Sequence, residues 1–124
     1  MTGPDAATVE TVWYRAEGRC ERCGLWLDWF DRGWRWSVQH RVARGMGGSR
    51  EQWLNWPSNL AILCGSATSP GSCHDDVENQ HRDQAYLDGW AVRRPLNPAD
   101  IPVLHHSLGA VLLTDQGTYQ EAAA

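Results

Sequence analysis

The order of polar and apolar positions predicts a short amphipathic helix near the N-terminus. Four apolar residues recur there at helical spacing and define one face of it: Val9, Val12, Trp13 and Ala16. Asp5 precedes this run as a candidate N-cap, and Gly18 follows it as a candidate stop. This helix leads the chain into its first pair of cysteines.

The middle of the chain has the pattern of strands separated by loops. Residues 25–38 are rich in tryptophan, which predicts a β-hairpin or an irregular insertion. We expect its tryptophans to lie in the core, and the alternative is a platform on which nucleic-acid bases stack. The branched residues of segment 38–42 predict a strand, and the glycines of segment 45–48 predict a loop after it. Residues 59–64 are apolar and predict a second, buried strand.

A helix and a second hairpin complete the predicted elements. Ser72 and Asp75 form a capping box, which opens a helix that extends to about Gly89. Residues 103–119 predict a β-hairpin that turns at residues 115–117. A chain of 124 residues has room for one domain, whose core is marginal unless another cross-link supports it.

The four cysteines are candidates for that cross-link. Cys20 and Cys23 are spaced Cys-x2-Cys, and Cys64 and Cys73 follow as Cys-x8-Cys. The N-terminus lacks a signal-peptide pattern and no apolar run approaches the ~20 residues of a bilayer span, so we expect a cytoplasmic protein without a membrane partner. In a reducing compartment this pattern favours one tetrahedral structural zinc over two disulfides, and Gly24 permits the tight turn of a zinc knuckle. The alternatives are a redox Cys-x-x-Cys motif, which lacks a surrounding βαβ pattern, and four buried thiols without metal.

The charge is unevenly distributed along the chain. The formal net charge is -4, which argues mildly against a high-affinity, non-specific nucleic-acid binder. All eleven basic residues are arginines, however, and eight of them lie between positions 15 and 50. This segment is either a solvated polar surface or an arginine-rich face that contacts phosphate groups.

Two histidines have positions that suit hydrolytic chemistry. If Cys73 binds zinc and opens the helix, His74 lies in the first helical turn and projects away from the zinc, toward the strand that bears His40. A strand histidine that faces a helix histidine supplies one group to activate water and another to hold a divalent cation on a phosphate.

Together these motifs resemble the HNH endonuclease family, specifically its small phage-encoded members with a cysteine-bound zinc. The resemblance covers most of the chain and rests on motifs that occur in order: Gly18 to Gly24, Val38 to Arg41, Gly45 to Gly48, Asn59 to Cys64, and Cys73-His74. It implies an α+β fold, a small ββα-metal, treble-clef-like domain with a zinc knuckle and flanking helices. Residues 1–17 would form the N-terminal helix, residues 18–90 the zinc-stapled nuclease core, and residues 91–124 a C-terminal hairpin extension and tail.

The resemblance also implies roles for individual residues. His40 would be the general base that takes a proton from water, and Asn59 would orient it by hydrogen bonds from its side chain to the backbone. His74 would bind a catalytic divalent ion, which is Mg²⁺, Mn²⁺, Ni²⁺ or Zn²⁺. Arg41 and Arg44 are candidates for phosphate contacts.

One position departs from the family pattern. Where the family has Asp or His before the general base, this chain has Gln39, whose neutral amide oxygen is a poorer ligand for a hard cation. Helical spacing offers two substitutes, Glu78 and His81, which lie four and seven residues beyond His74.

Two functions of different class follow from the resemblance. The first is a metal-dependent HNH endonuclease that hydrolyses phosphodiester bonds of DNA by nicking or double-strand cleavage. If the chain is phage-encoded, it would act in the host cytoplasm during genome packaging, with the large terminase subunit as partner. The second is a non-catalytic zinc-bearing module that docks on DNA or on the terminase. The intact His40, Asn59 and His74 favour the enzyme, whereas Gln39 and the acidic balance favour the docking module.

Overall fold

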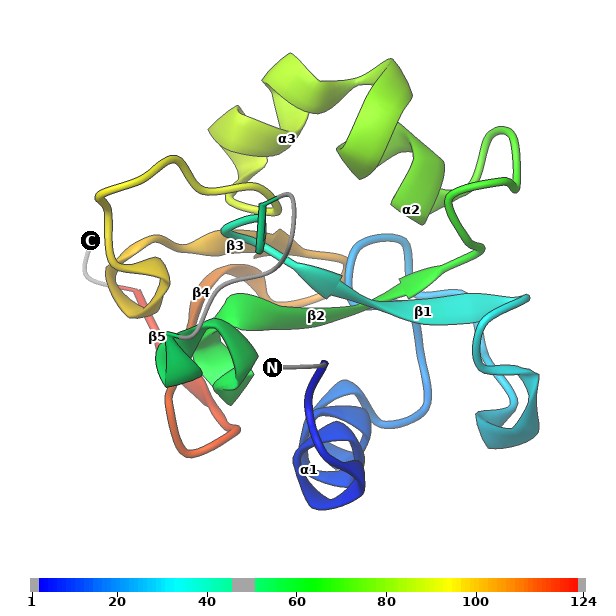
Figure 1. Cartoon of the computed structure of the whole chain (residues 1–124), viewed down its shortest axis with the longest axis horizontal. Helices are drawn as coiled ribbons and strands as arrows, with labels where there is room; N and C mark the ends of the chain where they lie inside the picture. Colours follow the sequence, from blue (N-terminus) through cyan, green and yellow to red (C-terminus); the bar gives the residue numbers. More distant parts are fainter. Residues whose placement is uncertain (1–2, 46–50, 123–124) are drawn as a thin grey trace.

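The computed structural model describes residues 3–45 and 51–122, which form a small α+β domain with two sheets and three α-helices (Figure 1). The α-helices are α1 (Ala6–Ala16), α2 (Cys73–Asp75) and α3 (Arg82–Asp88). The strands are β1 (Trp36–His40), β2 (Leu60–Cys64), β3 (Val103–His105), β4 (Gly109–Leu113) and β5 (Tyr119–Glu121). Five short helical segments join them: η1 (Trp29–Asp31), η2 (Gln52–Asn55), η3 (Pro57–Asn59), the π-helical η4 (Asp76–Gln80) and η5 (Pro98–Asp100).

The antiparallel pair of β1 and β2 lies at the centre of the domain and is covered on both faces. Its register places Trp36 opposite Cys64 and His40 opposite Leu60. Alternate residues of β2 point to opposite faces. One face packs against α1, below the pair in Figure 1, and the other packs against the segment that contains α2 and α3, above it. Because both faces are covered, every residue of β2 is buried.

Helix α1 agrees with its prediction from the sequence. Its predicted apolar face is buried at Val9, Val12 and Ala16. The side chain of Asp5 caps the helix by accepting a hydrogen bond of 2.8 Å from the backbone amide of Thr8. The helix ends at Ala16, and the next two residues have positive φ, so Gly18 follows the end of the helix as expected.

The predicted helix from residue 72 to residue 89 is divided into three parts. The side chain of Ser72 caps α2 through the amide of Asp75, and the chain leaves α3 at Gly89 in a left-handed conformation. Between these ends, η4 is a π-helix and His81 has φ -129°, which interrupts the helical path before α3. The prediction of one regular helix was therefore wrong in its interior.

The C-terminal residues form a three-stranded antiparallel sheet with the order β3, β4, β5. The prediction was a single hairpin that turned at residues 115–117. That turn joins β4 to β5, and a second turn at residues 106–108 joins β3 to β4. The sheet contributes Val103, Val111 and Leu113 to the same core as the cysteine-bearing segments.

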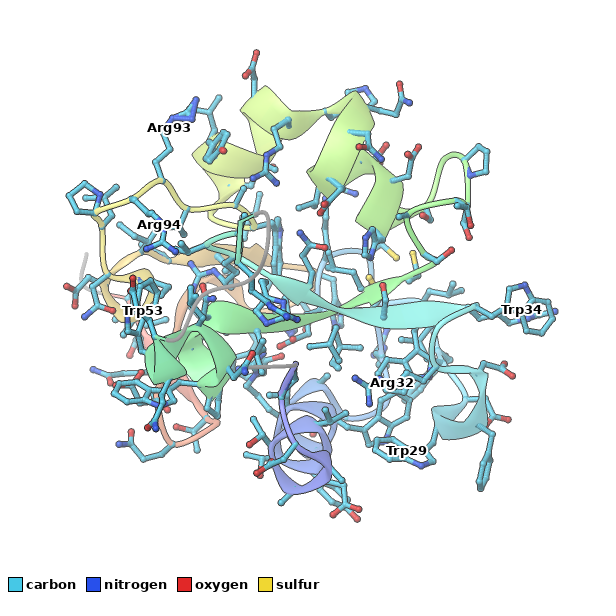
Figure 2. The ribbon with its side chains drawn as sticks, in the orientation of Figure 1. Trp29, Arg32, Trp34, Trp53, Arg93 and Arg94 are labelled. Carbon is cyan, nitrogen blue, oxygen red and sulfur yellow. The ribbon has the colours of Figure 1, made fainter. Side chains whose placement is uncertain are left out.

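The tryptophan-rich segment is irregular rather than a hairpin, and it divides between core and surface. Trp36 is fully buried, whereas Trp26 and Trp34 are 70% and 62% exposed. Figure 2 shows the ring of Trp34 projecting away from the domain. The guanidinium groups of Arg19 and Arg35 lie over these two exposed rings, 4.6 and 4.4 Å from their centroids. The prediction that these tryptophans belong to the core was wrong for Trp26 and Trp34, because a cation covers part of each ring instead.

None of the helices in residues 3–45 and 51–122 combines the length and the apolar character needed to span a bilayer.

Candidate metal centre and histidine groove

The four cysteines meet at one point of the fold. Their sulfur atoms all lie within 4.8 Å of one another, and those of Cys23 and Cys64 are 3.8 Å apart. Zn–S bonds of about 2.3 Å in tetrahedral geometry separate two sulfurs by about 3.8 Å. The cluster can therefore hold a metal ion such as zinc.

Two tight backbone turns bring the cysteines together despite their wide spacing. Gly24 has φ 82°, and its amide donates a hydrogen bond of 2.8 Å to the carbonyl of Cys20, which closes the first knuckle. Gly65 also has positive φ, and a Cβ atom there would collide with the side chain of Ser72. This close approach places Cys64 beside Cys73 at the start of α2.

Two hydrogen-bond donors lie against sulfur atoms of the cluster, where they favour the thiolate form that a metal requires. The backbone amide of Cys73 donates to the sulfur of Cys64 at 3.3 Å, and Arg22 donates to the sulfur of Cys73 at 3.1 Å. Hydrogen bonds from the thiol of Cys20 lower the pKa of Cys64 and of Cys23, and the same hydrogen bonds raise the pKa of Cys20 itself. Arg22 also pairs with Asp76 at 3.2 Å, so the cluster is tied to η4.

A buried carboxylate that the sequence did not indicate positions the first knuckle. Glu21 is fully buried and accepts two hydrogen bonds from the guanidinium of Arg15, at 2.9 and 2.7 Å. It also accepts from the amide of Ile62 at 2.9 Å and from the hydroxyl of Tyr119 at 2.6 Å. One carboxylate thus fixes the residue after Cys20 to α1, β2 and β5.

A groove of about 540 Å³ runs along β1 and the helical segment beside it. Both predicted functional histidines line it, together with a glutamine, a glutamate and an arginine: Gln39, His40, Arg44, His74 and Glu78. Ser37 and Gln39 are the residues of β1 that bond to the helical segment. Because side chains alternate along a strand, His40 lies on the other face of β1 from Ser37 and Gln39. It reaches the groove because it is the last residue of β1.

The ring of His74 is held in one tautomer by Ser37. The hydroxyl of Ser37 donates a hydrogen bond of 2.9 Å to the carbonyl of Gly65, so its single proton is used there. It therefore accepts the proton of Nδ1 of His74, with which it also makes a hydrogen bond. Nε2 of His74 keeps its lone pair, and burial lowers the pKa of this imidazole, which favours its neutral form.

His40 makes its hydrogen bond with the opposite ring nitrogen. Nε2 of His40 lies 2.8 Å from the side-chain oxygen of Asn55. Burial lowers the pKa of His40, nearby Arg44 lowers it further, and the bond to Asn55 and the charge of Glu78 act against that shift. The lowered pKa favours the neutral imidazole, which is the form that a general base needs.

Gln39 and Glu78 form a hydrogen-bonded pair in the lining of the groove. The amide nitrogen of Gln39 donates to a carboxylate oxygen of Glu78 at 2.7 Å, and Gln39 itself is 6% exposed. Since the amide nitrogen faces the carboxylate, Gln39 serves here as a donor that holds Glu78. The only anionic side chain that lines the groove among the described residues is that of Glu78.

His81 does not join this site, which corrects its prediction as a candidate ligand. Its ring bonds Asp76 at 3.0 Å and its side chain is 65% exposed. The i to i+7 spacing from His74 holds only in a regular α-helix, and the π-helical η4 breaks that register.

Asn59 makes the kind of contacts that were predicted for it, from its side chain to the backbone. It is fully buried, accepts from the amide of Val42 at 2.7 Å, and donates to the carbonyl of Val42 at 3.2 Å. It also donates to the carbonyl of Leu54 at 2.9 Å. The chain after His40 and the chain before Asn55 are therefore clamped to the same side chain.

The prediction of a phosphate contact was wrong for Arg41. Its side chain is fully buried and donates to four backbone carbonyls, which belong to Ser58, Gly89, Pro98 and Ile101. Arg15 is likewise buried, so the arginine-rich segment is not one continuous phosphate-binding face. Arg44 lines the groove beside His40. Of the predicted glycine loop only Gly45 is described; Met46 to Gly48 lie outside the described residues.

Two residues of the candidate site, Ser37 and Asn55, were not predicted from the sequence. The alternation of β1 would have found Ser37, because it lies two residues before Gln39 and shares its face. Asn55 had no such signal, since its contact with His40 depends on the path of η2.

Comparison with known proteins gave no relative: no protein-family model, no curated protein and no solved structure matches the chain.

Proposed function

We propose that the protein is a metal-dependent endonuclease of the HNH type that hydrolyses phosphodiester bonds of DNA. The observation that carries the proposal is the pair of histidines on one groove, with opposite ring nitrogens engaged by protein groups. One imidazole keeps a lone pair on Nε2 beside a carboxylate, and the other keeps one on Nδ1. That division suits one histidine that binds a cation and one that accepts a proton.

The cation site of the proposal consists of His74 and Glu78. Nε2 of His74 and the carboxylate of Glu78 are ligand types that divalent ions accept, and Gln39 holds the carboxylate in the groove. In this proposal Glu78 takes the place of the Asp or His that the family has at the position of Gln39. When bound, the ion supplies positive charge that stabilises the phosphate and its leaving oxygen.

The chain's own groups carry out the proton transfer. Nδ1 of His40 takes a proton from water as the water oxygen forms its bond to phosphorus. The bond from phosphorus to the leaving oxygen then breaks, and that oxygen keeps the electron pair and receives a proton from solvent. Arg44, which lines the groove, would contact a non-bridging phosphate oxygen. Asn59 acts at a distance, because it fixes the backbone on either side of the base.

The test is nicking of supercoiled plasmid by the zinc-loaded protein after EDTA treatment and addition of Mg²⁺, Mn²⁺ or Ni²⁺. We expect cleavage that depends on the divalent ion and that His40→Ala abolishes. His81→Ala is the matched control, because His81 is exposed and lies outside the groove, and it should cleave like the wild type. The absence of cleavage with every metal, in a folded zinc-loaded protein, would refute the proposal.

A second candidate function is a non-catalytic module that docks on DNA or on the phage large terminase subunit. The exposed apolar side chains of the irregular segment favour it: Leu25, Trp26, Phe30 and Trp34, with Phe30 90% exposed. Such a module would bind its partner equally well in the wild type and in His40→Ala, without cleavage in either.

A further inference from the structure

We infer that Asn55 is a positioning residue for His40, whose side-chain oxygen holds the imidazole in the Nε2–H tautomer and leaves Nδ1 as the proton acceptor. The inference rests on the proposed function and adds a residue to it that no motif contains. Its geometric basis is the distance of 2.8 Å between Nε2 of His40 and Oδ1 of Asn55. An acceptor oxygen on Nε2 requires the proton to be there.

The backbone fixes the two partners relative to each other. Asn55 ends η2, and the carbonyl of Leu54, one residue before it, accepts a hydrogen bond from Asn59. Val42, two residues after His40, is bonded to the same asparagine side chain through both its amide and its carbonyl. The approach of Asn55 to His40 is thus set on both sides by one buried group and does not depend on a flexible side chain alone.

The contrast with His74 gives the arrangement its chemical meaning. Ser37 holds His74 as the Nδ1–H tautomer, which leaves Nε2 for a cation. Asn55 holds His40 in the reverse form, which leaves Nδ1 for a proton. Two imidazoles on one groove are thereby assigned different tasks by their hydrogen-bond partners, since a ring in the wrong tautomer presents an N–H where a lone pair is needed.

A third histidine provides an internal reference for the measurement. Nδ1 of His105 accepts from the backbone amides of Ser107 and Leu108, at 3.1 and 3.2 Å. Backbone amides only donate, so neutral His105 is also the Nε2–H tautomer. Its contacts are independent of the groove, and its ring signals therefore show the pattern expected for His40.

The first experiment reads the tautomers directly, without any activity. Long-range ¹H–¹⁵N correlation spectra of the ¹⁵N-histidine-labelled, zinc-loaded full chain are recorded above the pKa of the imidazoles. We expect His40 and His105 to show a protonated Nε2, and His74 a protonated Nδ1. In Asn55→Ala, His40 should become a mixture of tautomers while His74 stays unchanged, which also verifies that the fold persists. A protonated Nδ1 on His40 in the wild type would overturn the inference.

The second experiment measures nicking kinetics with saturating metal. Asn55→Ala should lower kcat by about 10- to 100-fold with KM for DNA unchanged, because Asn55 acts through His40. Asn55→Asp keeps an acceptor oxygen and should restore the tautomer and part of kcat. The control Gln84→Ala removes an exposed amide of α3 and should leave kcat unchanged. If the wild type cleaves DNA and Asn55→Ala has the same kcat, the role of Asn55 is refuted and the proposed function stands. If the wild type does not cleave DNA, the proposed function is refuted, and the catalytic role of Asn55 with it.

Discussion

The clamp formed by Asn59 gives the most direct test of how the groove is built. Asn59→Ala removes three hydrogen bonds of 2.7, 2.9 and 3.2 Å from a fully buried site. Each such bond contributes roughly 1 kcal/mol, and the amide of Val42 loses its acceptor in the interior. The free energy of unfolding should therefore fall by about 3 kcal/mol, a large part of the ~5–15 kcal/mol of a typical domain.

Urea unfolding at a fixed, saturating zinc concentration measures this change. With a urea m-value of about 1–3 kcal/mol/M, the midpoint should move down by about 1–3 M. Asn59→Asp is the matched variant: it keeps the acceptor for Val42 but places a buried carboxylate oxygen against the carbonyls of Val42 and Leu54. It should be less stable than Asn59→Ala. A loss below about 1 kcal/mol in Asn59→Ala, or an Asn59→Asp protein as stable as the wild type, would refute the reasoning.

Three further predictions concern the interior, the metal and pH. Arg41→Lys should lower the free energy of unfolding by about 2 kcal/mol, since an ammonium cannot reach four carbonyls. The salt dependence of DNA binding should stay unchanged. Unchanged stability with a reduced salt dependence would instead support a phosphate contact by Arg41. Mass spectrometry should find one zinc per chain. Cys20→Ser should lose the bound zinc and should no longer unfold cooperatively on heating. A wild-type protein that unfolds in the same way with and without zinc would contradict this. The pKa values of His40 and His74 are lowered in the folded protein, so as the pH falls these histidines bind protons in the unfolded chain first. Their contribution to the free energy of unfolding should therefore be constant above about pH 6.5 and fall below it. Urea midpoints measured at several pH values test this. The nicking rate should fall only below the lowered pKa of His40, and a loss that begins above pH 7 would argue against it as the base.

The two parts of the candidate site, the cysteine cluster and the histidine groove, were predicted to different extents. The cysteine set was predicted from its spacing and from the expected reducing compartment, and the fold brings all four sulfurs together. The groove was predicted as a strand histidine facing a helix histidine, and both do line it. The hydrogen bonds from β1 to the helical segment, however, are made by Ser37 and Gln39, because the alternation of side chains places His40 on the other face of the strand. The catalytic assignment itself remains a prediction until cleavage is measured.

The arginines show why side-chain roles were harder to predict than elements. A guanidinium has the same local sequence signal whether it contacts phosphate, a carboxylate or carbonyls. Arg41 was expected to contact phosphate, yet it donates to four carbonyls in three chain segments, the farthest of them 60 residues away in sequence. Only the positions of those carbonyls decide the outcome, and they are set by distant parts of the chain.

The sequence by itself determined the features that depend on near neighbours. These are the cap and apolar face of α1, the capping box of α2, the left-handed turns at Gly24 and Gly89, and the cysteine spacing. Backbone propensities and short-range hydrogen bonds act over a few residues, so a local pattern is sufficient to specify them. The tertiary structure alone decided the π-helical turn that excludes His81, the burial of Arg41, and the meeting of Asn55 with His40. Each of these depends on contacts between segments far apart in sequence, whose free energy no local pattern contains.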